Sequence, residues 1–134
     1  MRPRTLRRRL RIEALAALLA ARFAVRFVST RQLLTWAARQ PRLLQRFADP
    51  DLAVQVAAAV EHVGAKTGAL CLPRALAAQA MLRRRGIASR LCLGVARDGR
   101  SLAAHAWVEV GQEIIIGEFD PASGPAYGQV AQFG

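Results

Sequence analysis

The first half of the chain repeats apolar residues every three or four positions, which is the spacing of amphipathic helices. It predicts one helix over residues 5–28 and a second that begins at a cap on Ser29 or Thr30 and stops before Pro41. A third helix is predicted over residues 52–63. Three helices therefore precede any strand.

A fourth helix is predicted from Cys71 to Arg85. Pro73 fits its first turn, where the missing N–H would have no partner in any case. Glycine often follows the last helical residue, so Gly86 is expected to end this helix and Gly64 the one before it. Cys71 then lies at the start of a helix.

From residue 87 the apolar period changes to two, which is typical of strands. The predicted strands are residues 89–95, 102–110 and 113–119, and residues 129–133 are a candidate edge strand. A tight turn at Gly111-Gln112 or Gln112-Glu113 joins the second strand to the third. Helices followed by a small antiparallel sheet predict an α+β fold. We divide the chain into a helical N-terminal region, residues 1–48, and a core, residues 49–134.

The chain of 134 residues is strongly basic, with 20 Lys+Arg against 9 Asp+Glu, and Lys66 is its only lysine. Such a charge suits a nucleic acid, an anionic membrane or an acidic peptide. No helix-turn-helix, zinc-finger or aromatic RNA-binding pattern accompanies it. We therefore predict no nucleic-acid partner and interpret most arginines as solvated helix faces. An acidic peptide or partner remains an alternative.

The N-terminus carries a basic stretch followed by apolar residues, an order that secretory signals also show. Glu13, Arg22 and Arg26 interrupt it, and the longest uncharged run is residues 14–21. A membrane span needs about 20 apolar residues. We expect a cytoplasmic protein, with the helix over residues 5–28 packed on its own domain or lying peripherally on a membrane or partner.

The two cysteines, Cys71 and Cys92, form neither a disulfide framework nor a CxxC pair. The two histidines, His62 and His105, are 43 positions apart in the sequence, so neither a metal site nor a cofactor is predicted. We interpret Cys92 as a buried structural thiol and His62 as a last-turn histidine. Cys71 and His105 remain as candidates for chemistry.

A cysteine at a helix start, a histidine on a strand and a carboxylate on the next strand can form a thiol nucleophile site. Helix N-termini and imidazoles stabilise thiolates, and a third group orients the imidazole. A turn at Gly111-Gln112 puts His105 opposite Glu118, and a turn one residue later puts it opposite Asp120. In either register we expect both acids on the face of His105, together with Trp107.

Several of these segments resemble the transglutaminase-like leader peptidases of lasso-peptide biosynthesis, the microcin-processing cysteine proteases. The resemblance covers roughly residues 50–120 and rests on Cys71-Leu72-Pro73-Arg74-Ala75-Leu76, Leu82-Arg83-Arg84-Arg85-Gly86-Ile87, Leu93-Gly94-Val95 and Ala104-His105-Ala106-Trp107-Val108-Glu109. It implies a papain-like or transglutaminase-like core in which Cys71 is the nucleophile and His105 the general base and then acid. The third member implied is Asp120, which precedes a proline, with Glu118 as the alternative.

The resemblance also implies partners. In the stand-alone members of this family a separate leader-recognition protein delivers the precursor peptide, and the released core passes to an ATP-dependent macrolactam synthetase. Residues before 50 leave no room for a winged-helix recognition module. The backbone N–H of Cys71 would help to hold the oxyanion, with Gln55 as one candidate for the second donor. Arg83 and Arg84 are candidate contacts for a partner or an acidic leader.

Two other functions remain open at this stage. The same fold would support transglutaminase-type acyl transfer between glutamine side chains and amines. A non-catalytic adaptor would instead bind a peptide or an anionic membrane through the basic N-terminal helix.

Overall fold

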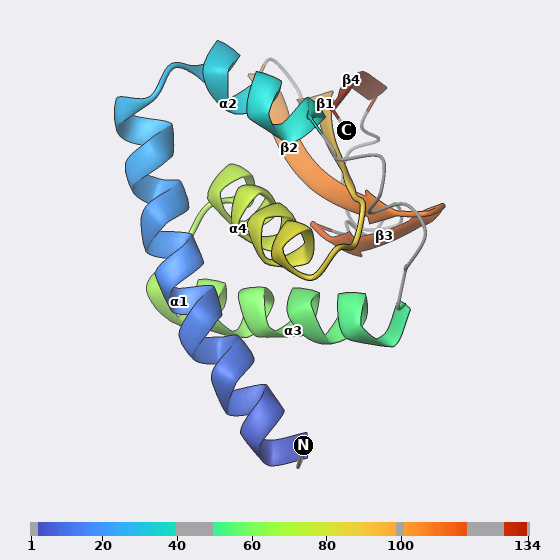
Figure 1. Ribbon diagram of the computed structural model, residues 1–134. Helices are drawn as coiled ribbons and strands as arrows, with labels where there is room; N and C mark the ends of the chain where they lie inside the picture. The colour runs from blue at the N-terminus through green and yellow to red at the C-terminus, as the bar shows by residue number, and fades with distance from the viewer. Residues whose placement is uncertain (1–2, 40–49, 99–100, 118–127, 134) are drawn as a thin grey trace.

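The computed structural model describes residues 3–39, 50–98, 101–117 and 128–133, and its helices precede its strands as predicted (Figure 1). The elements are α1 (Pro3–Phe27), α2 (Thr30–Ala38), α3 (Pro50–Thr67), α4 (Cys71–Arg84), β1 (Arg90–Asp98), β2 (Ser101–Val110), β3 (Glu113–Ile116) and β4 (Gly128–Phe133). The strands form one antiparallel sheet in the order β3-β2-β1-β4, so β4 is the predicted edge. The α+β prediction is confirmed.

The helix α4 lies in the middle of the molecule, with α3 below it, α1 across one end and the sheet on the other side (Figure 1). Eight of its fourteen residues are buried, and three of them are alanines. Small side chains let neighbouring helices approach closely, and larger side chains such as Met81 and Leu82 fill the remaining space. The whole fold therefore packs around α4.

Helices α3 and α4 end in the same way, with a glycine in the left-handed region. Gly68 has φ 71° and Gly86 has φ 73°. The N–H of Ala69 donates to the carbonyl of Gly64, and that of Ile87 donates to the carbonyl of Leu82, as in a Schellman motif. The prediction for Gly86 is confirmed, whereas the prediction that Gly64 ends α3 is wrong. Gly64 is an interior residue of that helix.

Helix α1 has apolar residues on two opposite sides. Leu10, Ala14, Leu18 and Ala21 are buried in the same core as α3 and α4. Ile12, Leu19, Phe23 and Phe27 are exposed, Phe27 to 66%. Packing on its own domain thus accounts for one side of α1 only. Within the described residues, no helix has the length and apolar character needed to cross a bilayer. The boundary proposed between residues 48 and 49 lies outside the described residues.

The arginines at the end of α4 make internal contacts. The guanidinium of Arg83 lies 4.0 Å from the ring centroid of Trp36 and donates to the Trp36 carbonyl. Arg85 forms two hydrogen bonds with Glu13 on α1, and Arg84 forms one. These arginines tie α1 and α2 to α4. Arg83 and Arg84 therefore have internal contacts, and their proposed contact with a partner stays a prediction.

We predict that Glu13→Gln lowers the free energy of unfolding by about 1–2 kcal/mol at neutral pH, because a charge-assisted pair that is only partly exposed is lost. The hydrogen bond from Arg85 holds the pKa of Glu13 below its ordinary 4.5. Wild type keeps this advantage above that value and loses it as the pH falls through the folded pKa. Urea unfolding of both proteins from pH 7 to pH 3 measures the difference, and a pH-independent difference would contradict the prediction.

Gln79 is the one fully buried side chain of α4 that is polar. It is 0% exposed, and neither polar atom of its amide has a hydrogen-bond partner in the described part of the chain. A buried amide without partners costs about 1–3 kcal/mol.

We therefore predict that Gln79→Met raises the free energy of unfolding by about 1 kcal/mol, since methionine fills a similar volume without the unpaired amide. Gln55→Met on the exposed side of α3 is the matched control and should change stability by less than about 0.5 kcal/mol. Thermal and urea unfolding report both values. A clear loss of stability in Gln79→Met would contradict the interpretation.

Candidate functional site

Cys71 is the first residue of α4, as the sequence predicted. Leu70 precedes it as the N-cap residue in an extended conformation and makes no side-chain hydrogen bond to the first turn. The N–H groups at a helix start carry the positive end of the helix dipole. Cys71 lies in this first turn and is partly buried against the core.

Arg74 holds the loop that leads to Cys71. Its Nε donates to the carbonyl of Ala69 at 2.7 Å, and its Nη1 pairs with Glu61 on α3 at 2.9 Å. The guanidinium passes over Gly64, where an added Cβ would lie 2.7 Å from Nε. Gly64 is therefore small because Arg74 occupies the space beside it. The contact was not predicted, because a glycine near a helix end is expected to end the helix and an arginine in a first turn is expected to face solvent.

We predict that Gly64→Ala destabilises the protein by about 1 kcal/mol, although alanine is the better helix former by a similar amount. The new methyl group displaces the Arg74 guanidinium, and the loss of one of its two hydrogen bonds, at about 1.5–3 kcal/mol, outweighs the gain in helix propensity.

An Arg74→Met background supplies the control. There the methyl group meets no guanidinium, so Gly64→Ala should become neutral or stabilising by up to about 1 kcal/mol. Urea unfolding of the four proteins closes the double-mutant cycle. Equal effects of Gly64→Ala in both backgrounds would show that Arg74 does not determine the need for glycine.

His105 lies on β2 and is half-buried. Its Nε2 forms a short hydrogen bond with the carbonyl oxygen of Gly117. A carbonyl only accepts, so Nε2 carries the proton and Nδ1 of the neutral ring is an acceptor. This tautomer gives His105 a basic nitrogen at Nδ1, as a general base requires.

The position of Gly117 permits no other residue. Its φ is +81°, and an added Cβ would lie 2.6 Å from the carbonyl oxygen of Ala106. This close approach puts the Gly117 carbonyl against the ring of His105. The sequence pattern pointed only to acidic side chains as groups that orient His105, so the backbone oxygen of Gly117 was missed. The glycine at the end of an apolar strand was the available signal.

Trp107 shares the face of His105, as predicted from the alternation of the strand. The two ring centroids are 6.1 Å apart with an interplanar angle of 22°. Trp107 is buried, and its Nε1 donates to Glu109 at 3.2 Å. The indole is thus stacked beside the imidazole.

The hairpin between β2 and β3 corrects the register on which the acid assignment was based. Val110 pairs with Glu113, which confirms the turn at Gly111-Gln112. A bulge then shifts the ladder, so that Val108 pairs with Ile116. An uninterrupted count, which sets His105 opposite Glu118 or Asp120, therefore does not apply. Glu118 and Asp120 themselves lie outside the described residues.

Cys71 and His105 come from elements that pack together, α4 and β2. Ala106 and Val108 of β2 are buried in the core that Cys71 also contacts, whereas His105 alternates with them and so lies on the other face of the strand. Among the described contacts, none is a hydrogen bond between the Cys71 thiol and the His105 ring. The catalytic pairing of the two residues stays a prediction.

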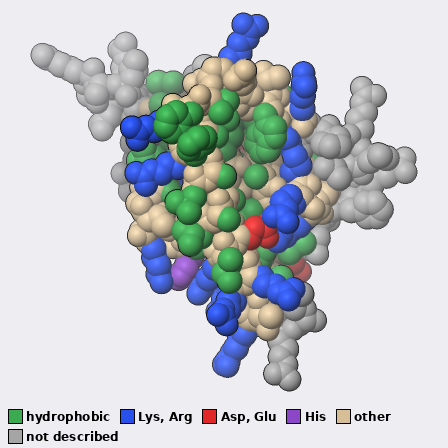
Figure 2. Space-filling view, turned by 60° about the vertical axis from the view of Figure 1, so that its left-hand side comes forward, with side chains coloured by type: hydrophobic (Ala, Val, Ile, Leu, Met, Phe, Trp, Pro, Cys, Tyr) green, Lys and Arg blue, Asp and Glu red, His purple; other side chains and the backbone are tan. Residues whose placement is uncertain are grey.

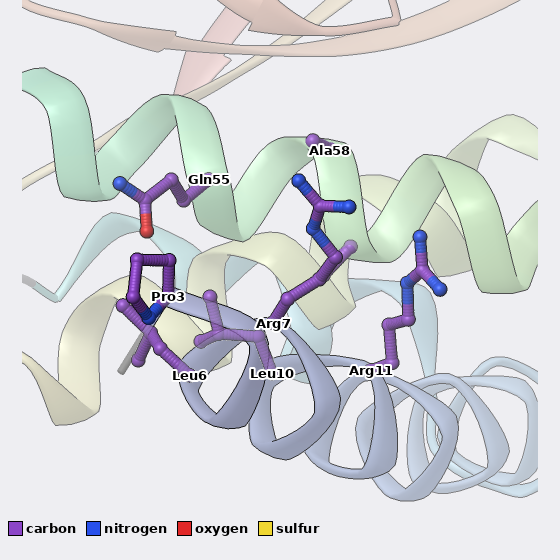
Figure 3. Close-up of a pocket in the computed structure, with 8 residues that line it drawn as sticks. Pro3, Leu6, Arg7, Leu10, Arg11, Gln55 and Ala58 are labelled. Atoms are coloured by element: carbon purple, nitrogen blue, oxygen red, sulfur yellow. The ribbon is translucent and has the colours of Figure 1, made fainter. Parts of the chain in front are cut away.

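The remaining candidates fall outside this region. Cys92 is fully buried on β1, as predicted for a structural thiol. Gln55 is exposed on α3 and lines a cavity with Pro3, Leu6 and Arg7 of α1 (Figure 3), so it is not placed as an oxyanion donor. Within the described residues, no cluster of three His, Cys, Asp or Glu side chains could hold a metal ion.

His62 lies in a basic environment near the end of α3. Partial burial lowers its pKa, and the positive charges of Arg11 and Lys66 lower it further. The ring is therefore neutral at neutral pH.

Residues 15–131 of the chain match the family model described as the transglutaminase-like superfamily. The chain belongs to this superfamily, which includes cysteine proteases and acyltransferases. The match begins within α1 and ends within β4, so it spans the helices as well as the sheet. No curated protein and no solved structure matches the chain significantly.

Proposed function

We propose that this protein is a cysteine endopeptidase that removes the leader from a ribosomally synthesised lasso-peptide precursor. The observation that carries the proposal is a thiol at the uncapped start of α4 in a chain of the transglutaminase-like superfamily. The sequence resemblance of the Cys71 and His105 segments supports the finer assignment to leader removal.

In the proposed reaction, His105 accepts the thiol proton of Cys71 at Nδ1. The thiolate attacks the carbonyl carbon of the scissile peptide bond, and the first-turn N–H groups of α4 stabilise the resulting oxyanion. His105 then returns the proton to the departing amine, and a thioester remains on Cys71. Water, deprotonated by His105, hydrolyses the thioester and restores the thiol.

In this proposal, a backbone carbonyl and an acidic side chain share the task of orienting and stabilising His105. The Gly117 carbonyl fixes the tautomer of His105 through Nε2. Asp120, with Glu118 as the alternative, would stabilise the imidazolium that forms when the ring is protonated.

We further infer that a separate leader-recognition protein delivers the precursor in the cytoplasm and that the product passes to a macrolactam synthetase. The reduced state that a catalytic thiol needs is typical of that compartment. Acyl transfer to an amine differs only in the group that attacks the thioester, so product analysis separates the two reactions.

The test is cleavage of the precursor peptide in the presence of the recognition protein. Cys71→Ala and His105→Ala should each lower the cleavage rate by at least about 10³-fold, because the nucleophile and its base act as one unit. Mass spectrometry of the products should show two fragments that together have gained one water.

Cys92→Ala is the matched control, and it should retain cleavage because that thiol is fully buried on β1. Iodoacetamide should inactivate wild type and Cys92→Ala equally. Cleavage that survives in Cys71→Ala would overturn the peptidase proposal. A product joined to an added amine, without gain of water, would identify an acyltransferase.

A further inference from the structure

Two adjoining hollows lie on the surface of α1, and the second is lined by Leu70 and Pro73, which flank Cys71 in the sequence. The first has a volume of about 680 Å³ and lies between the first half of α1 and the end of α3. The second has a volume of about 430 Å³ and lies between the second half of α1 and the loop before α4. Leu15 and Thr67 line both hollows, so together they form one groove.

The second hollow is mainly apolar and ends beside the nucleophile. Leu15, Leu19 and Val25 line it from α1, and Leu70 and Pro73 line it from the other side. Leu70 is 75% exposed and directly precedes Cys71. An exposed leucine next to a catalytic thiol offers a contact for the residue beside a scissile bond.

Every charged side chain that lines the groove is a cation. Arg22 and Arg26 border the apolar hollow, and Arg7, Arg11 and Lys66 are among those in the first hollow. Figure 2 shows hydrophobic side chains in a band on this side of the molecule, with Lys and Arg on both sides of it. The neutral His62 also lines the first hollow, beside the cations Arg11 and Lys66.

We propose that this groove binds the substrate peptide through an apolar side chain near Leu70 and acidic side chains along α1. The inference deepens the proposed peptidase function and rests on it. The rise from Arg11 to Arg26 is about 22 Å, which an extended peptide covers with about seven residues. Leu70 and Pro73, which flank Cys71 in the sequence, line the groove, and all its charged side chains are cations, so an acidic peptide is favoured over a second copy of this basic chain.

The test measures binding of short fluorescein-labelled peptides to the Cys71→Ala protein by fluorescence anisotropy. One peptide carries a leucine flanked by aspartates, a second has serine in place of leucine, and a third has lysines in place of the aspartates. The first should bind at least about 10-fold more tightly than the other two and should weaken with rising salt.

Arg22→Glu combined with Arg26→Glu should reverse the preference, so that the lysine peptide binds better than the aspartate peptide. Arg9→Glu combined with Arg31→Glu changes the net charge equally at exposed sites that line neither hollow, and it should keep the original order of preference. Leu19→Asp should weaken the leucine peptide about 10-fold, whereas Phe27→Asp, outside the groove on the same helix, should not.

Equal effects of the groove and control variants would overturn the groove, even if Cys71-dependent cleavage persists. Loss of binding to anionic lipid vesicles in Leu19→Asp, with peptide binding unchanged, would instead identify a membrane surface. Peptide binding that follows the predicted order without any cleavage would support the groove and contradict the peptidase. In a cleaving protein, the groove variants should raise KM about 10-fold with kcat nearly unchanged.

Discussion

The burial of α4 is the constraint on which the rest of this structure depends. A helix surrounded on most sides must carry small or well-fitted apolar side chains, and the alanines of α4 meet that requirement. If the proposed peptidase function holds, the same helix also presents its first residue to a substrate. The chain satisfies both demands by burying the middle of α4 and leaving Leu70, just before it, largely exposed.

Arginines position the two ends of α4. At the start, Arg74 joins Ala69 in the preceding loop to Glu61 on α3. At the end, Arg85 joins α4 to Glu13 on α1. The chain is basic overall, and the sequence alone suggested that such residues cover the surface or contact a partner. Arg74 and Arg85 are instead partly buried and pair with Glu61 and Glu13, whereas Arg22 and Arg26 line the groove on α1.

The order of elements, the start of α4 and the turn at Gly111-Gln112 were predictable because each depends on local periodicity or on turn chemistry. The role of Gly64 was not, since a glycine near a helix end has the same local pattern whether it ends the helix or makes room for Arg74. The bulge in β3 was also hidden, because a run of three isoleucines carries no alternation from which to count a register. That bulge is the reason why the register counted from the sequence does not hold, and the assignment of Asp120 or Glu118 as the third member stays a prediction.

The hydrogen bond from His105 to the Gly117 carbonyl has a consequence for how this site tolerates mutation. A backbone oxygen is retained whatever side chains change around it, so the orientation of the imidazole is insulated from most substitutions in β3. The exception is position 117, where the positive φ and the nearby Ala106 carbonyl require glycine.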